Sequence, residues 1–181
     1  MPEFLLPLIL GLIGSLGAHD QVLVAHLTLR QGARPMLLGV AIATAAAGCA
    51  IMVGLAALVP DTAPRATLAA LALGLAGVLA LLRPTRPAPT EPTHSLFAAA
   101  LVFAAQQFCD ITRVLTLAAA LLLPQPIAVA SGFAAGNALA LVLGWIAPKR
   151  ITRPSMRRAT QGIGLILLLA SGVLAWGAAP H

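Results

Sequence analysis

Residues 17–22 read Gly-Ala-His-Asp-Gln-Val and residues 107–112 read Gln-Phe-Cys-Asp-Ile-Thr, so each stretch places an aspartate inside a long apolar run. The remaining carboxylates lie at the terminus or between apolar runs: Glu3, Asp61 and Glu91. An ionisable group inside a membrane is costly and usually faces a partner, an ion or water. We therefore expect Asp20 and Asp110 to meet near the middle of a bilayer, at the interface between the two halves of the chain.

The composition of the 181-residue chain indicates an integral membrane protein. Hydrophobic residues make up 60% of the chain and charged residues 9%, and the mean hydropathy is +0.97. A soluble domain carries roughly 25% charged residues, so this chain cannot cover a surface that faces water. The net charge of +6 is therefore not a nucleic-acid signal. We expect the lipid bilayer to be the main partner of the chain.

Six apolar segments approach the roughly 20 residues that a spanning helix needs. They are residues 4–29, 35–59, 66–82, 96–123, 127–147 and 160–178. We predict an all-α membrane protein built from two three-helix repeats, residues 1–83 and 95–181, joined by a proline-rich linker at 84–94. Because each half has an odd number of spans, the second half would be inverted, which is a transporter architecture.

The basic residues predict the orientation of the chain. One set of alternate loops carries nine of them: Arg30, Arg34, Arg83, Arg86, Lys149, Arg150, Arg153, Arg157 and Arg158. The opposite set carries only Arg65. Because basic loops stay on the cytoplasmic side, we expect a multi-pass protein of the cell inner membrane. Its linker at 84–94 would be cytoplasmic and both termini would face outward.

Two segments carry small residues at every fourth position. In the fifth segment these are Gly132, Gly136, Ala140 and Gly144, and in the second they are Gly39, Ala43 and Ala47. Small residues let helix backbones approach closely in membranes. We interpret both stripes as packing faces within the chain, with a homodimer interface as the alternative.

The two buried aspartates are the candidate cation and proton site, and the candidate metal ligands. Two carboxylates that lie close together share a proton, because the like charge raises one pKa. A metal ion would neutralise both and displace that proton. The alternatives for Asp20 and Asp110 are a hydrogen bond between helices or a salt bridge. Arg113 follows Asp110 by one helical turn, so it either pairs with Asp110 or extends toward the membrane surface.

Further polar residues are candidate ligands near the two aspartates. Gln107 and Thr112 complete the candidate site in the second half. His19 and Cys109 precede the aspartates at equivalent positions, and their side chains favour softer metals. Asn137 of the fifth segment either covers the site or joins two helices.

At residues 17–22 and 107–112 the chain resembles the Golgi-type calcium/manganese transporter family, within the lysine-exporter superfamily. That family carries Glu-x-Gly-Asp-Lys/Arg-Ser/Thr in the first helix of each inverted half. The resemblance implies six spans and exchange of manganese or calcium for protons. Asp20, Asp110 and Thr112 match the motif. The other motif positions differ: Gly17 and Gln107 replace glutamate, His19 and Cys109 replace glycine, and Gln21 and Ile111 replace the basic residue.

These observations favour a transporter that exchanges a divalent cation, manganese or a softer metal, for protons, with no resident cofactor. Two other functions fit the same sequence. Arg113 would bind the anionic group in an exporter of a small amino acid, or the chain would be a non-transporting scaffold with a vestigial site. We do not expect an enzyme, because the sequence lacks the Ser-His-Asp, metal-hydrolase and phosphate-loop patterns.

Overall fold

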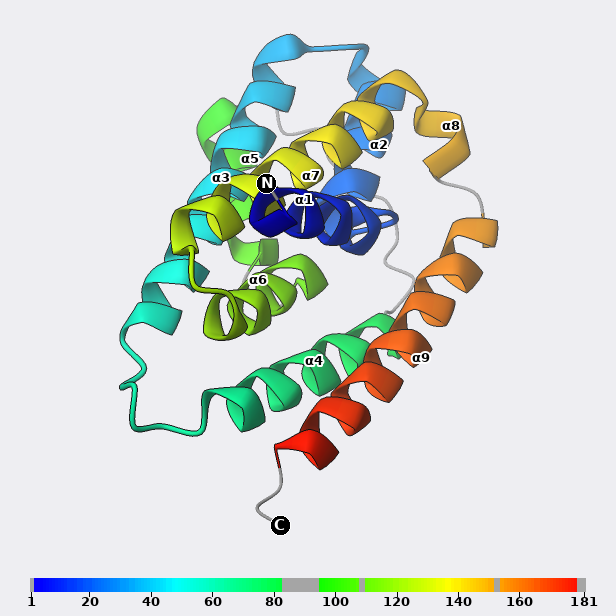
Figure 1. Cartoon of the computed structure of the whole chain (residues 1–181). Helices are drawn as coiled ribbons and strands as arrows, with labels where there is room; N and C mark the ends of the chain where they lie inside the picture. Colours follow the sequence, from blue (N-terminus) through cyan, green and yellow to red (C-terminus); the bar gives the residue numbers. More distant parts are fainter. Residues whose placement is uncertain (1, 83–94, 108–109, 152–153, 179–181) are drawn as a thin grey trace.

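The computed structural model describes residues 2–82, 95–107, 110–151 and 154–178, and every regular element in this part is a helix (Figure 1). In chain order these are α1 (Pro2–Ser15), α2 (His19–Gln31), α3 (Pro35–Ala57), α4 (Arg65–Leu81), α5 (Leu96–Gln107), α6 (Ile111–Leu122), α7 (Pro126–Ile146), α8 (Pro148–Ile151) and α9 (Pro154–Gly177). The predicted all-α class is confirmed. The predicted linker at 84–94 lies outside the described residues.

Several helices are long and apolar enough to span a membrane. Within the described residues, α3, α7 and the part of α9 at Arg158–Gly177 satisfy this criterion alone. The number of candidate spans rises to five if each of two bent helix pairs forms one span. These pairs are α1 with α2, which are bent by 58°, and α5 with α6, which are bent by 56°. The helix α4, with 17 residues, is shorter than this criterion requires. A membrane protein is therefore supported, while six spans stay a prediction.

The continuous helices that we expected over 4–29 and 96–123 are each broken in two. The first break follows Ser15, and Gly17 has a φ of 70°, a conformation that glycine adopts without the steric penalty of a side chain. The second break ends at Asp110, whose backbone is extended, with φ −89° and ψ 140°. Hydropathy is continuous through both breaks, which is why the segments looked like single helices.

The helix α7 supports the first broken pair. Gly132 and Gly136 lie against the backbone of α1 near Phe4, Leu8 and Leu12, and Gly144 lies against Gln21 of α2. A Cβ at Gly132 would lie 2.7 Å from the carbonyl oxygen of Phe4. The interpretation of this stripe as a packing face is confirmed. Figure 1 shows α1 crossing α7 in the middle of the bundle.

The second broken pair lies against α3, and α4 contacts both α6 and α9. The α4–α9 pair is tied by Ser171, whose hydroxyl donates to the carbonyl oxygen of Ala70 at 2.8 Å. The small residues that recur on α3, Gly39, Ala43 and Ala47, are exposed, unlike those on α7. Around a Cβ at Gly39, no atom of a described residue lies within 4 Å.

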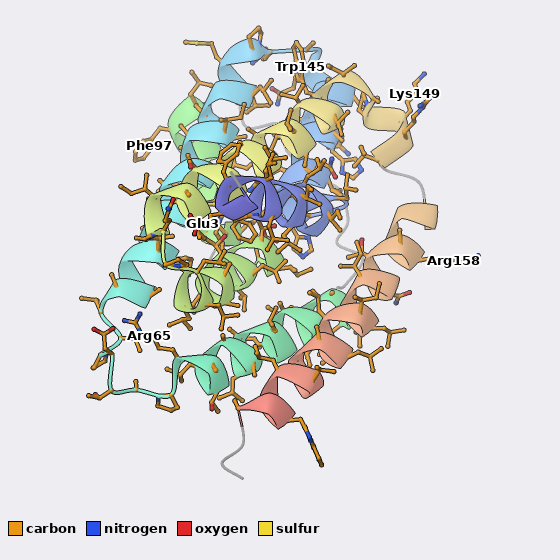
Figure 2. The ribbon with its side chains drawn as sticks, in the orientation of Figure 1. Glu3, Arg65, Phe97, Trp145, Lys149 and Arg158 are labelled. Atoms are coloured by element: carbon orange, nitrogen blue, oxygen red, sulfur yellow. The ribbon has the colours of Figure 1, made fainter. Side chains whose placement is uncertain are left out.

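The connections between helices lie at opposite ends of the bundle. Trp145 and Lys149 lie at one end, whereas Arg65 lies toward the other (Figure 2). Arg65 forms an ion pair with Asp61, with a nitrogen–oxygen distance of 2.8 Å. The predicted orientation of the chain stays a prediction.

Candidate functional site

The two helix breaks meet in the interior of the bundle. The hydroxyl of Ser15, the last residue of α1, lies 3.1 Å from the hydroxyl of Thr112, in the first turn of α6. Both side chains are fully buried. Gly14 permits this approach, because a Cβ there would lie 2.9 Å from Cδ1 of Leu115. We call this meeting point of the two breaks the junction.

Each aspartate occupies the start of the helix that follows its break. Asp20 is in the first turn of α2 and Asp110 is the N-cap residue of α6, and both are buried, with 3% and 4% exposure. One carboxylate oxygen of Asp20 accepts a hydrogen bond from the backbone N–H of Gln21 at 2.7 Å. The partial positive charge at a helix N-terminus stabilises a carboxylate there. The breaks therefore place both aspartates at the N-termini of helices inside an apolar bundle.

Gln21 joins the first break to α7. Its amide nitrogen donates to the carbonyl oxygen of Ala140 at 2.6 Å, and its amide oxygen accepts from the N–H of Gly17 at 2.6 Å. Gly17 belongs to the break, where backbone N–H groups lack the partners that a continuous helix would give them. The fully buried Gln21 therefore repairs the break and fixes it to the supporting helix.

Asn137 lies on α7 at the level of the first break. Phe133, one turn earlier, contacts Gly11 of α1, and Ala140, one turn later, accepts the hydrogen bond from Gln21 of α2. Asn137 is fully buried. Neither its amide nitrogen nor its amide oxygen has a hydrogen-bond partner among the described residues. An unpartnered buried amide is costly, so Asn137 remains a candidate ligand.

The structure excludes one of the two arrangements expected for Arg113. Its side chain is fully buried, so it does not extend to the membrane surface. The expected pair with Asp110 stays a prediction. One terminal nitrogen, Nη1, donates to Sγ of Cys49 at 2.9 Å. The guanidinium therefore lies against α3.

Gln107, the last residue of α5, also faces α3. With its amide nitrogen toward α3, it donates to the carbonyl oxygen of Thr44 at 2.7 Å. Its amide oxygen then accepts from the N–H of Ala45 and the hydroxyl of Thr44, both at 3.1 Å. Thr116 of α6 is likewise occupied, donating to the carbonyl oxygen of Thr112 at 2.7 Å. The bonds of Gln107 hold the second break against α3, whereas the bond of Thr116 lies within α6.

The structure places one predicted site residue, Thr112, at the junction, and it gives others partners that the sequence did not indicate. The meeting of Asp20 and Asp110 stays a prediction. The hydroxyl of Thr112 contacts that of Ser15, and the amide of Gln107 hydrogen-bonds α3. His19 is the first residue of α2. Cys109 lies outside the described residues. Within the described part of the chain, no group of three or more His, Cys, Asp or Glu side chains is placed to hold a metal ion.

Sequence reasoning did not assign three residues of this region. Ser15 and Gln21 flank Asp20, and their signal was visible as polar residues inside an apolar run. Gly48 leaves room for the guanidinium, because a Cβ there would lie 2.6 Å from Nε of Arg113. A single glycine in a helix with many small residues gives no signal of that kind.

Comparisons of the chain with protein-family models, with curated proteins and with solved structures found no match. The resemblance to the calcium/manganese transporter family therefore stays a prediction.

Proposed function

We propose that this protein is a secondary transporter that exchanges a divalent metal cation for protons across a membrane. The observation that carries the proposal is the contact between Ser15 and Thr112, at 3.1 Å. It joins two broken helices, each of which begins again at a buried aspartate. Broken helices that meet inside a membrane protein are a common way to build a transport site.

In this mechanism Asp20 and Asp110 bind the cation when both are ionised and bind protons when the cation leaves. Repulsion between the carboxylates favours binding of a proton or a cation. The N-termini of α2 and α6 moderate that repulsion, so that the empty site remains accessible to both. Neutral oxygen ligands would complete the coordination, and Asn137 of α7 and Thr112 of α6 are the candidates. Manganese or a softer metal is the proposed cargo.

The packing supports two related halves. The broken pair α1–α2 of the first half lies on α7 of the second half, while the broken pair α5–α6 of the second half lies on α3 of the first. The third helix of each half, α4 and α9, pairs with its counterpart. This exchange of contacts is what an approximate two-fold relation would produce, and we propose an inverted 3+3 arrangement on that basis.

The test is metal-dependent proton flux in proteoliposomes that contain a pH-sensitive dye. Manganese, zinc, cobalt, nickel and calcium are added in turn to the wild type, Asp20→Asn and Asp110→Asn. The matched control is Asp61→Asn, since Asp61 is 93% exposed and lies in a loop. We expect flux with at least one metal, retained in the control and lost in both site variants. Absence of flux with all five metals, from folded protein, would contradict the proposal.

A further inference from the structure

A pocket lies at one end of the bundle, between the turn that precedes α3 and the start of α5 (Figure 1). Its volume is about 360 Å³, and its walls are formed by Ala33, Arg34, Pro35, Met36, Leu37 and Leu96. Leu37 belongs to the apolar cluster against which Trp145 packs, so this is the end that carries Trp145 and Lys149. Because a cavity of roughly 150 Å³ holds one benzene molecule, the pocket has room for a phosphate group and the glycerol attached to it.

Arg34 supplies the charge of this pocket. It is exposed, so its guanidinium is open to a ligand, in contrast to that of the fully buried Arg113. No ion pair joins Arg34 to a carboxylate of a described residue. The charge is therefore available to an anion that enters the pocket from outside.

The surroundings of Arg34 add positive charge and no negative charge. Lys149 and Arg150 of α8 are exposed at the same end of the bundle. The carboxylates of the described residues lie elsewhere: Glu3 in α1, Asp61 beside Arg65 toward the other end, and Asp20 and Asp110 in the interior. In the described part of the chain, this end is thus a basic surface that attracts anions.

The other walls of the pocket are apolar, and apolar surface continues beside it. Met36 is 69% exposed, and Phe97, which follows Leu96 at the start of α5, is 74% exposed. Figure 2 shows Phe97 on the outside of the bundle. In a membrane, side chains of this kind contact the acyl chains of lipids, which are as apolar as leucine. A ligand that uses both parts of the site combines an anionic headgroup with apolar chains, which a free phosphate ion does not.

We propose that this pocket binds one anionic phospholipid, whose phosphate pairs with Arg34 and whose acyl chains lie along Met36, Leu96 and Phe97. Basic clusters at the ends of membrane helices attract anionic lipids, and the pocket gives this attraction a fixed position. The site goes beyond cation exchange and does not involve the buried aspartates. Failure of lipid binding therefore leaves the transport proposal standing, and the reverse also holds.

The test is a lipid titration of the full-length protein in detergent without added metal, followed by native mass spectrometry. Dioleoyl phosphatidylglycerol is compared with dioleoyl phosphatidylcholine, which has the same chains but no net charge. We expect the first phosphatidylglycerol to bind roughly tenfold more tightly than the first phosphatidylcholine, and inorganic phosphate at equal concentration to leave it bound. Equal affinity for the two lipids would mean an apolar groove without headgroup selection, and displacement by phosphate would mean a site for free anions; each outcome overturns the proposal.

Charge-matched variants test whether the lipid occupies this pocket. Arg34→Gln removes the charge inside it, and Arg158→Gln removes an equal charge from an exposed position outside it. We expect phosphatidylglycerol affinity to fall roughly tenfold in Arg34→Gln and to stay unchanged in Arg158→Gln. Arg34→Lys should keep the lipid, because lysine binds phosphate as a point charge. Thermal unfolding verifies that each variant is folded. Equal affinity in the two glutamine variants would mean attraction by net charge alone and would overturn the proposal.

Discussion

The side-chain oxygens of Ser15 and Thr112 lie 3.1 Å apart although 97 positions separate the two residues in the chain. This bond is buried, and it is the point at which the two broken helices touch. Removal of this bond should therefore lower the stability of the whole bundle.

We expect Ser15→Ala to lower the free energy of unfolding by about 0.5–1.5 kcal/mol, because Thr112 loses a buried partner. The measurement is thermal or denaturant unfolding in detergent. Ser131→Ala is the control, since Ser131 is exposed and bonds only to carbonyl oxygens of its own helix. Equal effects of the two substitutions would mean that the junction contributes nothing to stability.

Gly136→Ala should destabilise the protein by about 1–3 kcal/mol, the usual range for overpacking. The added Cβ would meet the backbone of α1 at the carbonyl oxygen of Leu8 and, at 2.6 Å, the backbone nitrogen of Leu12. Gly162→Ala on α9 is the matched control, because no atom of a described residue lies within 4 Å of its Cβ. Unfolding midpoints of the two variants in the same detergent give the comparison. If Gly136→Ala is as stable as the control, α1 and α7 are not packed as described.

Gln21→Ala should cost about 1–3 kcal/mol, since it leaves the N–H of Gly17 and the carbonyl oxygen of Ala140 without their partner. Hydrogen exchange should show the loss locally, as faster exchange of the Gly17 amide. Gln31→Ala, at the last position of α2, controls for removal of a glutamine from the same helix. Unchanged exchange at Gly17 would show that the break does not depend on this side chain.

The predicted orientation is tested with single cysteines at Thr62 and Lys149, in a background in which Cys49 and Cys109 are replaced by serine. A membrane-impermeant maleimide should label Thr62→Cys from outside the cell and Lys149→Cys only after permeabilisation, because basic loops stay inside. Lys149 lies in α8, at the opposite end of the bundle from Arg65, which follows Thr62 by three residues (Figure 2). The reverse labelling pattern would invert the proposed orientation.

The apolar segments and the burial of the two aspartates were predicted from the sequence, because both signals are local. Hydropathy averages over many residues, so it located the segments but could not show the breaks, which depend on the backbone at Gly17 and Asp110. The partners of Thr112, Gln107 and Arg113 come from other helices, and no spacing along the chain encodes them. The packing face on α7 could be predicted because its small residues recur at every fourth position. The role of Gly48 could not be predicted, because a single small residue forms no such pattern.

The close fit of α1 on α7 also limits how this protein can move. Sliding α1 along α7 by one residue would bring side chains onto the backbone that Gly132 and Gly136 now approach. These two helices therefore behave as a fixed frame. Gln21, which bonds Ala140 of α7, extends this frame into the first turn of α2.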